Sequence, residues 1–143
     1  MGIRWKSWFW SGLLAGVVVS ASGVLLAHNV LGPRYVAAYR SLMVDPLPVG
    51  LTIVQNLTVR FGFGFLGMFL YVAFRPRFGP GPRTAILAGL ALAVGTYLPT
   101  LMLLAQFGVL TGRDLLVATP WSLAEAMAAC LAGAWIYREP AAP

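Results

Sequence analysis

The chain has 143 residues, of which 59% are hydrophobic and only 10% charged, and its formal net charge is +6. Soluble domains carry about 25% charged residues, so this composition and the mean hydropathy of +0.81 exclude an ordinary water-soluble fold and indicate a single all-α transmembrane domain over residues 1–143. The positive charge does not indicate nucleic-acid binding, because the basic residues stand mostly singly at the ends of apolar segments instead of clustering.

The first predicted membrane span covers residues 8–31. This segment is longer than the roughly 20 apolar residues needed to cross a bilayer. Arg4 and Lys6 precede it, as basic residues precede the apolar region of a secretory signal. Signal peptides, however, have shorter apolar regions of about 7–15 residues. We therefore expect an uncleaved membrane anchor.

A short helix is predicted after the first span, over residues 33–43. Tyr35, Tyr39 and Leu42 stand there at positions i, i+4 and i+7, a spacing typical of one face of a helix. The two arginines of this segment could reach lipid headgroups from such a helix. We therefore expect it to lie in the membrane interface.

The second and third predicted spans cover residues 48–74 and 84–107, and the breaker-rich stretch 75–83 separates them. Within the third span, Pro99 has no backbone N–H to donate, so we expect a kink there. The second span is interrupted by three polar residues, Gln55, Asn56 and Arg60.

The fourth predicted span covers residues 119–137, because Thr119 is a good N-cap residue and Pro120 suits the first helical position. Small residues recur along one face of every span, and such faces let helices approach closely in lipid. We therefore expect a compact four-helix bundle. The predicted packing residues are Gly12, Gly16, Gly23, Gly64, Gly67, Gly89, Ala128 and Ala132.

The distribution of basic residues predicts the orientation of the spans. If the N-terminus is inside, six basic residues fall on the inner side and three on the outer side, so the positive-inside rule places both termini in the cytoplasm. The predominance of arginine over lysine favours a GC-rich bacterial genome. We therefore expect a multi-pass protein of the bacterial inner membrane.

Two charged residues, Arg60 and Glu125, lie on predicted packing faces of the second and fourth spans. An arginine at mid-depth of a bilayer costs about 2.5–3.5 kcal/mol on insertion scales and normally points inward to a partner. We therefore predict an Arg60–Glu125 pair, with Asn56, Thr96 or Thr100 completing its hydrogen bonds. Such a pair could fix the register of the helices, or it could line a path for a substrate or a proton.

Few residues are suited to catalysis or cofactor binding. His28 is the only histidine; it could supply the one axial ligand of a pigment, or it could form an interfacial hydrogen bond. Four acidic residues and the single Cys130 offer no catalytic or metal-binding constellation. We expect no enzyme, no metal and no cofactor besides lipid, with pigment or quinone contact as the alternative.

Three features resemble small, uncharacterised bacterial four-span membrane proteins. They are the run His28-Asn-Val-Leu-Gly-Pro-Arg-Tyr35, the Arg-Pro-Arg-Phe-Gly stretch at 75–79, and a glutamate in the last span. The resemblance covers most of the chain and implies no activity.

Together these features favour an accessory or scaffold subunit of a larger membrane complex, with an energy-converting (respiratory or photosynthetic) complex as one candidate. The alternative is a small transporter or channel component that works as an oligomer around the Arg60–Glu125 pair. The expected partners are membrane lipids and other transmembrane subunits, and no nucleic acid.

Overall fold

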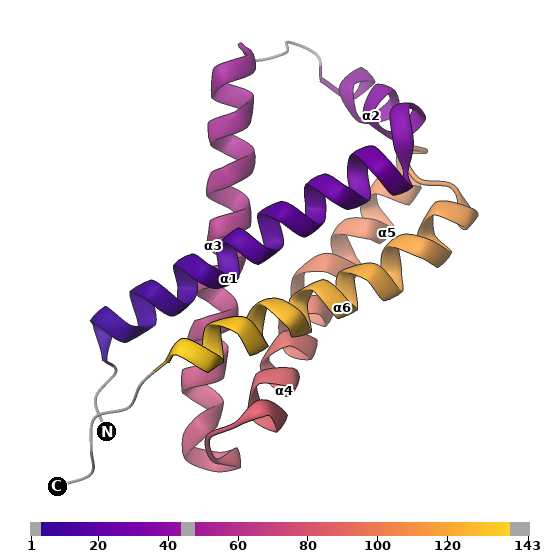
Figure 1. The fold of residues 1–143 in the computed structure, drawn as a ribbon. Coiled ribbons are helices and arrows are strands. Elements are labelled where there is room, and N and C mark those ends of the chain that lie inside the picture. Colours follow the sequence, from indigo (N-terminus) through magenta and orange to yellow (C-terminus); the bar gives the residue numbers. More distant parts are fainter. Residues whose placement is uncertain (1–3, 44–47, 138–143) are drawn as a thin grey trace, which may run out of the picture.

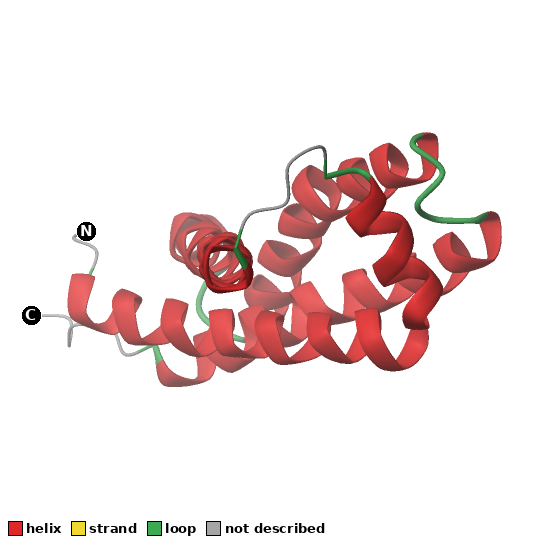
Figure 2. Cartoon of the chain, turned by 90° about the horizontal axis from the view of Figure 1, so that it is seen from above, coloured by secondary structure: helices red, strands yellow, loops and turns green. Residues whose placement is uncertain are grey.

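The computed structural model describes residues 4–43 and 48–137, and every regular element in these ranges is a helix. Figure 2 shows this helical content from above. Four helical stretches, here called spans, are long and apolar enough to cross a membrane, which confirms the predicted number: Trp5–Val30, Val49–Phe78, Pro82–Gln106 and Gly112–Ile136.

The first span consists of α1 (Trp5–Leu25) and a π-helical turn, η1 (Leu26–Val30). The chain then turns at Gly32, whose φ of 74° few other residues adopt easily. The short predicted helix is present as α2 (Gly32–Ser41), and none of its residues is buried. Arg34 of α2 forms an exposed ion pair with Asp114, with 3.0 Å between Nη2 and Oδ2.

The second span is a single helix, α3 (Val49–Phe78). It extends four residues beyond the predicted end at 74, because Pro76 is accommodated in its last turn. The turn that follows is confined to residues 79–81, of which Gly79 and Gly81 have positive φ. Near this end, the Arg75 guanidinium lies over the rings of Tyr71 and Tyr137, at 5.4 and 5.2 Å from the ring centres.

The third span is interrupted near the predicted kink. It consists of α4 (Pro82–Leu92), the π-helical turn η2 (Ala93–Tyr97) and α5 (Leu98–Gln106). Pro99 occupies the first turn of α5, where it cannot donate to the carbonyl of Gly95. A π-helical turn directly before it absorbs this missing hydrogen bond by widening the helix locally.

The fourth span, α6 (Gly112–Ile136), begins seven residues before the predicted start at Thr119. A stronger cap lies upstream: the Asp114 N–H donates to Thr111 Oγ1 at 3.3 Å, and the Thr111 N–H donates to Asp114 Oδ2 at 2.7 Å. This reciprocal capping box starts the helix, and Pro120 lies inside it. Glu125 is therefore thirteen residues, about 20 Å at 1.5 Å per residue, from the start of the span and close to its middle.

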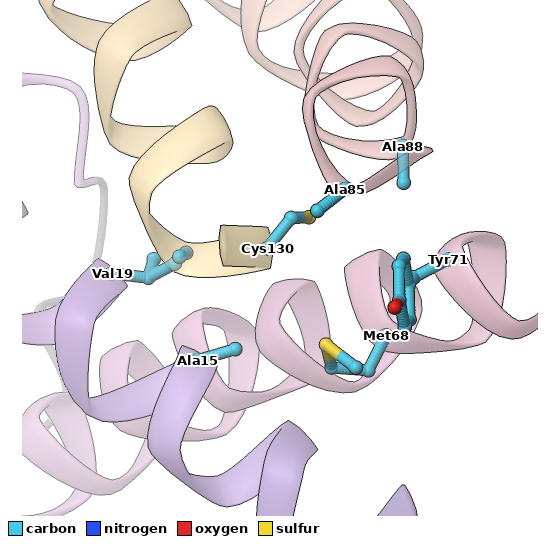
Figure 3. Close-up of a cluster of buried hydrophobic side chains, with 8 residues drawn as sticks. Ala15, Val19, Met68, Tyr71, Ala85, Ala88 and Cys130 are labelled. Atoms are coloured by element: carbon cyan, nitrogen blue, oxygen red, sulfur yellow. The ribbon is translucent and has the colours of Figure 1, made fainter. Parts of the chain in front are cut away.

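The core lies where all four spans meet. Figure 3 shows most of its side chains, which α1, α3, α4 and α6 contribute in pairs. They are Ala15, Val19, Met68, Tyr71, Ala85, Ala88, Ala129 and Cys130. Most of them are small, as expected for helices that associate by close packing in lipid.

The N-terminal half of α3 (49–59) lies outside this core. It stands apart from the other helices (Figure 1), and in Figure 2 α3 is seen nearly end-on while α1 and α6 lie across the view. The buried residues of α3 are all in its C-terminal half: Gly64, Gly67, Met68 and Tyr71. The spans therefore do not pack along their full lengths as the expected compact bundle would.

Candidate functional site

A cluster of polar side chains surrounds Glu125 between α1, α3, η2 and α6. Glu125 is only 6% exposed, and its carboxylate interacts with the hydroxyls of Ser22 and Tyr97 and with the charge of Arg60. We call the set Ser22, Arg60, Tyr97, Trp121 and Glu125 the Glu125 cluster. It brings together residues from α1, α3, η2 and α6, whereas α4 and α5, which also contact α6, contribute none of them.

Trp121 connects α6 to α1 within this cluster. Its indole Nε1–H donates to Ser22 Oγ at 2.9 Å. Because an indole nitrogen can only donate, the Ser22 oxygen is the acceptor and its own proton is available to Glu125. Trp121 lies one helical turn before Glu125, so the same face of α6 carries both side chains that approach Ser22.

Tyr97 enters the cluster from the end of η2. Its ring packs against Phe63, with 5.1 Å between the ring centres. Its hydroxyl is buried and faces Glu125. Within the described residues this hydroxyl has no hydrogen-bond partner. Because the π-helical turn adds to the helix circumference, it gives the Tyr97 side chain a different direction from the one a regular helix would give. Such turns occur often at functional sites.

Arg60 lies at the edge of the cluster against α1. Its Nη1 donates to the Val19 carbonyl oxygen at 3.1 Å, and its guanidinium lies so close to Gly23 that a Cβ on Gly23 would overlap it. In the part of the chain that the structure describes, Arg60 and Glu125 do not come within ion-pair distance of each other. Arg60 and Glu125 therefore share a polar cluster without forming the direct salt bridge that was predicted, because Arg60 bonds to α1 instead.

The three residues predicted to complete the pair lie elsewhere. Each donates to a carbonyl of its own helix: Asn56 Nδ2 to Thr52 at 2.9 Å, Thr96 Oγ1 to Leu92 at 2.6 Å and Thr100 Oγ1 to Thr96 at 2.7 Å. Side chains four residues from a carbonyl reach it easily within a helix. The prediction that they join the cluster was wrong, and Asn56 is exposed.

Sequence reasoning did not identify Ser22, Tyr97 and Trp121 as members of the cluster. The polar character of Ser22 and Tyr97 within apolar spans was a usable signal. A straight-helix projection, however, places Thr96 and Thr100 on the packing face of the third span. The π-helical turn η2 changes this register, so the projection could not identify Tyr97.

Three of the predicted packing glycines, Gly12, Gly16 and Gly64, lie where α1 and α3 cross. A Cβ on Gly64 would come within 2.6 Å of the Gly16 Cα and 2.8 Å of the Gly12 carbonyl oxygen. Gly12 and Gly16 lie under the rings of Phe65 and Phe61. This contact brings backbone against backbone, which only glycine allows.

Gly67 and Gly89 face α6. A Cβ on Gly67 would lie 2.9 Å from the Cys130 Sγ, and one on Gly89 would lie 2.6 Å from the Met127 Cα. On α6 itself Ala128 is exposed and Ala132 only half-buried. Placing Ala128 on the packed face was wrong, because the buried stripe is rotated by about one residue, whereas the prediction for the half-buried Ala132 stays a prediction. The buried residues of α6 are Ala118, Ser122, Glu125, Ala126, Ala129, Cys130 and Gly133.

His28 lies apart from the Glu125 cluster. It is exposed in η1, its Nδ1 is 3.3 Å from the Val24 carbonyl oxygen, and it borders a shallow surface hollow together with Arg40 of α2. In residues 4–43 and 48–137 no three His, Cys, Asp or Glu side chains gather in a way that could hold a metal ion. The His28 ring therefore contacts a carbonyl oxygen one turn earlier in its own span.

No protein-family model, curated protein or solved structure matches this chain. The interpretation of its function therefore depends on the geometry of two features, the Glu125 cluster and the exposed half of α3.

Proposed function

We propose that the protein is an accessory subunit of a larger membrane complex, and that the N-terminal half of α3 is its docking segment for a transmembrane helix of another subunit. The observation that carries this proposal is the exposure of this segment around its whole circumference. Leu51, Ile53, Val54, Leu57 and Val59 are all exposed there.

Polar side chains in the same segment support a protein partner over lipid alone. Gln55 and Asn56 are exposed beside the apolar residues, and lipid tails offer an amide no hydrogen-bond partner. In membranes, Asn and Gln side chains hydrogen-bond across helices and contribute about 0.6–2 kcal/mol to their association. Asn56 Nδ2 donates to the Thr52 carbonyl oxygen of its own helix, so a polar helix of another subunit would bond to the Gln55 amide and to the side-chain oxygen of Asn56.

The proposal includes an orientation in the bacterial inner membrane with both termini in the cytoplasm. Arg75, Arg77 and Arg83 flank the turn between α3 and α4, and the positive-inside rule assigns such a turn to the cytoplasm. In this orientation α2 lies in the outer interface, where its arginines meet headgroups.

Labelling of single cysteines tests the orientation. Cys130 is buried, so in a Cys130→Ala background a membrane-impermeant thiol reagent should label Arg113→Cys in intact cells. It should label Pro80→Cys only after the membrane is opened. The reverse pattern would contradict the proposed orientation.

Site-specific photo-crosslinking tests the docking segment. A photoreactive residue at Ile53, which is 54% exposed, is compared with one at Val94 of η2, which is 58% exposed. We expect position 53 to form one discrete protein adduct with a subunit that also co-purifies in mild detergent at fixed stoichiometry. Position 94 should react with lipid.

The adduct at position 53 should be lost when Gln55 and Asn56 are both replaced by leucine. Equal crosslinking at positions 53 and 94, or migration of the intact chain as a free monomer on a native gel, would overturn the accessory-subunit proposal.

A further inference from the structure

Glu125, at the centre of the Glu125 cluster, is a carboxyl group enclosed by the protein near the middle of the fourth span, α6. It is 6% exposed and lies about 20 Å from the start of α6. A buried carboxylate is costly unless it is paired and hydrogen-bonded. Arg60 interacts with Glu125 only at a distance, because its guanidinium bonds to the Val19 carbonyl oxygen and is lodged against Gly23.

The groups around Glu125 can satisfy both of its protonation states. Ser22 accepts one hydrogen bond from Trp121, which leaves its proton and its second lone pair for Glu125. When the carboxylate is ionised, the hydroxyls of Ser22 and Tyr97 can donate to it. When it is protonated, its O–H can donate to either hydroxyl oxygen. The hydroxyl groups only rotate between these two arrangements.

Tyr97 is the member of the cluster that has room for such a change. Its hydroxyl is buried, faces Glu125 and makes no hydrogen bond of ordinary length within the part of the chain that the structure describes. A buried hydroxyl without a hydrogen-bond partner needs an explanation. A Glu125 carboxyl group that alternates between accepting and donating a hydrogen bond provides one.

Few ionisable groups surround Glu125. Arg60 faces it from α3, Tyr97 from η2, and Cys130 lies one turn further along α6. From α1, the Ser22 hydroxyl faces Glu125, and the one charged residue of α1, Lys6, lies in its first turn. The one charged residue of α4, Arg83, is in its first turn, and α5 has none. Ionised Glu125 thus balances the charge of Arg60, whereas protonation leaves the cluster with a charge of +1.

We propose that Glu125 is a reversible proton-binding site inside the membrane, with Ser22 and Tyr97 as the hydrogen-bond partners of both its states. The step is the addition of one proton, taken from water, to a carboxylate oxygen, and its return to water on release. A protonation site at this depth is the element that a proton-coupled carrier or an energy-converting complex needs, and it operates independently of the docking segment on α3.

Infrared difference spectroscopy of the full-length protein in lipid vesicles, recorded as the pH is changed, tests the site. We expect a carboxylic-acid C=O band that grows on acidification, shifts in D₂O and is absent in Glu125→Gln. Glu125→Asp should keep a displaced band. Tyr97→Phe and Ser22→Ala should shift its frequency, because each removes one hydrogen-bond partner. Asp114→Asn, at the exposed start of α6, should leave the band unchanged.

Three results would overturn the proposal. One is a Glu125 carboxylate that stays ionised throughout the pH range in which the protein remains folded, and another is a band that never titrates. The third is a response to Na⁺ or K⁺ at constant pH, which would identify a metal-cation site. If Glu125→Gln does not fold, the frequency shifts of Tyr97→Phe and Ser22→Ala against Asp114→Asn still decide the assignment.

Discussion

The two halves of α3 have the same helical backbone and opposite environments. The C-terminal half buries Gly64 and Gly67 against other spans, and its Arg75 lies over the rings of Tyr71 and Tyr137. The N-terminal half buries no side chain and stands apart from the other helices (Figure 1), although it belongs to the same apolar span.

The comparison shows that hydrophobicity places a segment in the membrane but does not make it associate with another helix. Lipid tails are as apolar as leucine, so association depends on close packing and hydrogen bonds. The half of α3 whose glycines, Gly64 and Gly67, meet other spans is packed. The N-terminal half is exposed, and its one glycine, Gly50, has nothing within 4 Å.

The largest expected loss of stability is at Gly64, where a side chain would disrupt the packing of the C-terminal half of α3 against α1. Gly64→Val should lower the free energy of unfolding by about 3 kcal/mol or more, because its Cβ would meet the backbone of Gly16 and Gly12. Gly62→Val is the matched control, since a Cβ there meets nothing within 4 Å. Unfolding in mixed micelles of increasing SDS content measures both, and equal losses would refute the role of the glycine contact.

A smaller loss, about 1 kcal/mol, is expected for Gly67→Ala. Its new methyl group would lie 2.9 Å from the Cys130 Sγ and 3.2 Å from the Leu92 Cδ2, and both are side-chain ends that can move. Adding Cys130→Ala should recover part of the loss by removing the sulfur. A double variant less stable than Gly67→Ala by the full cost of Cys130→Ala would show that the two sites do not interact.

The hydrogen bond between Trp121 and Ser22 should contribute about 0.6–1 kcal/mol. Trp121→Phe and Ser22→Ala should each reduce stability, and the double variant should lose less than the sum of the two. Ser20→Ala serves as the control, because Ser20 bonds only to the Gly16 carbonyl of its own helix. Strict additivity in this cycle would mean that the bond does not hold α6 to α1.

The smallest effect on the isolated chain is expected in the N-terminal half of α3. Ile53→Ala and Leu57→Ala should change its stability by no more than about 0.5 kcal/mol, since neither side chain is buried. The same substitutions should weaken co-purification of the proposed partner subunit. Losses as large as that of Gly64→Val would show that this half packs within the chain after all.

Local sequence signals identified much of this fold. The four spans follow from hydropathy, and the helix after the first span from the spacing of its aromatic residues. The early start of α6 was also readable, because Thr111 and Asp114 form a capping box three residues apart. The Thr119-Pro120 pair suits a helix start equally well, and local chemistry alone did not rank the two.

The Glu125 cluster was predictable only in part. Arg60 and Glu125 are conspicuous as charges within apolar spans. Their partners were not conspicuous, because Arg60 is held by the backbone of α1. It donates to the Val19 carbonyl oxygen, and its guanidinium occupies the space that the missing side chain of Gly23 leaves. The sequence alone does not indicate which backbone groups a side chain from another span will reach.

The sequence by itself determined that this protein has four apolar helices and that two charges lie within them, because helix formation and partition into lipid depend on each segment's own residues. Only the tertiary structure decided that α3 packs along one half, that Tyr97 turns toward Glu125 and that Arg60 bonds to α1. These outcomes depend on where glycine backbones touch and where a π-helical turn changes the register, and both are settled only when the helices meet.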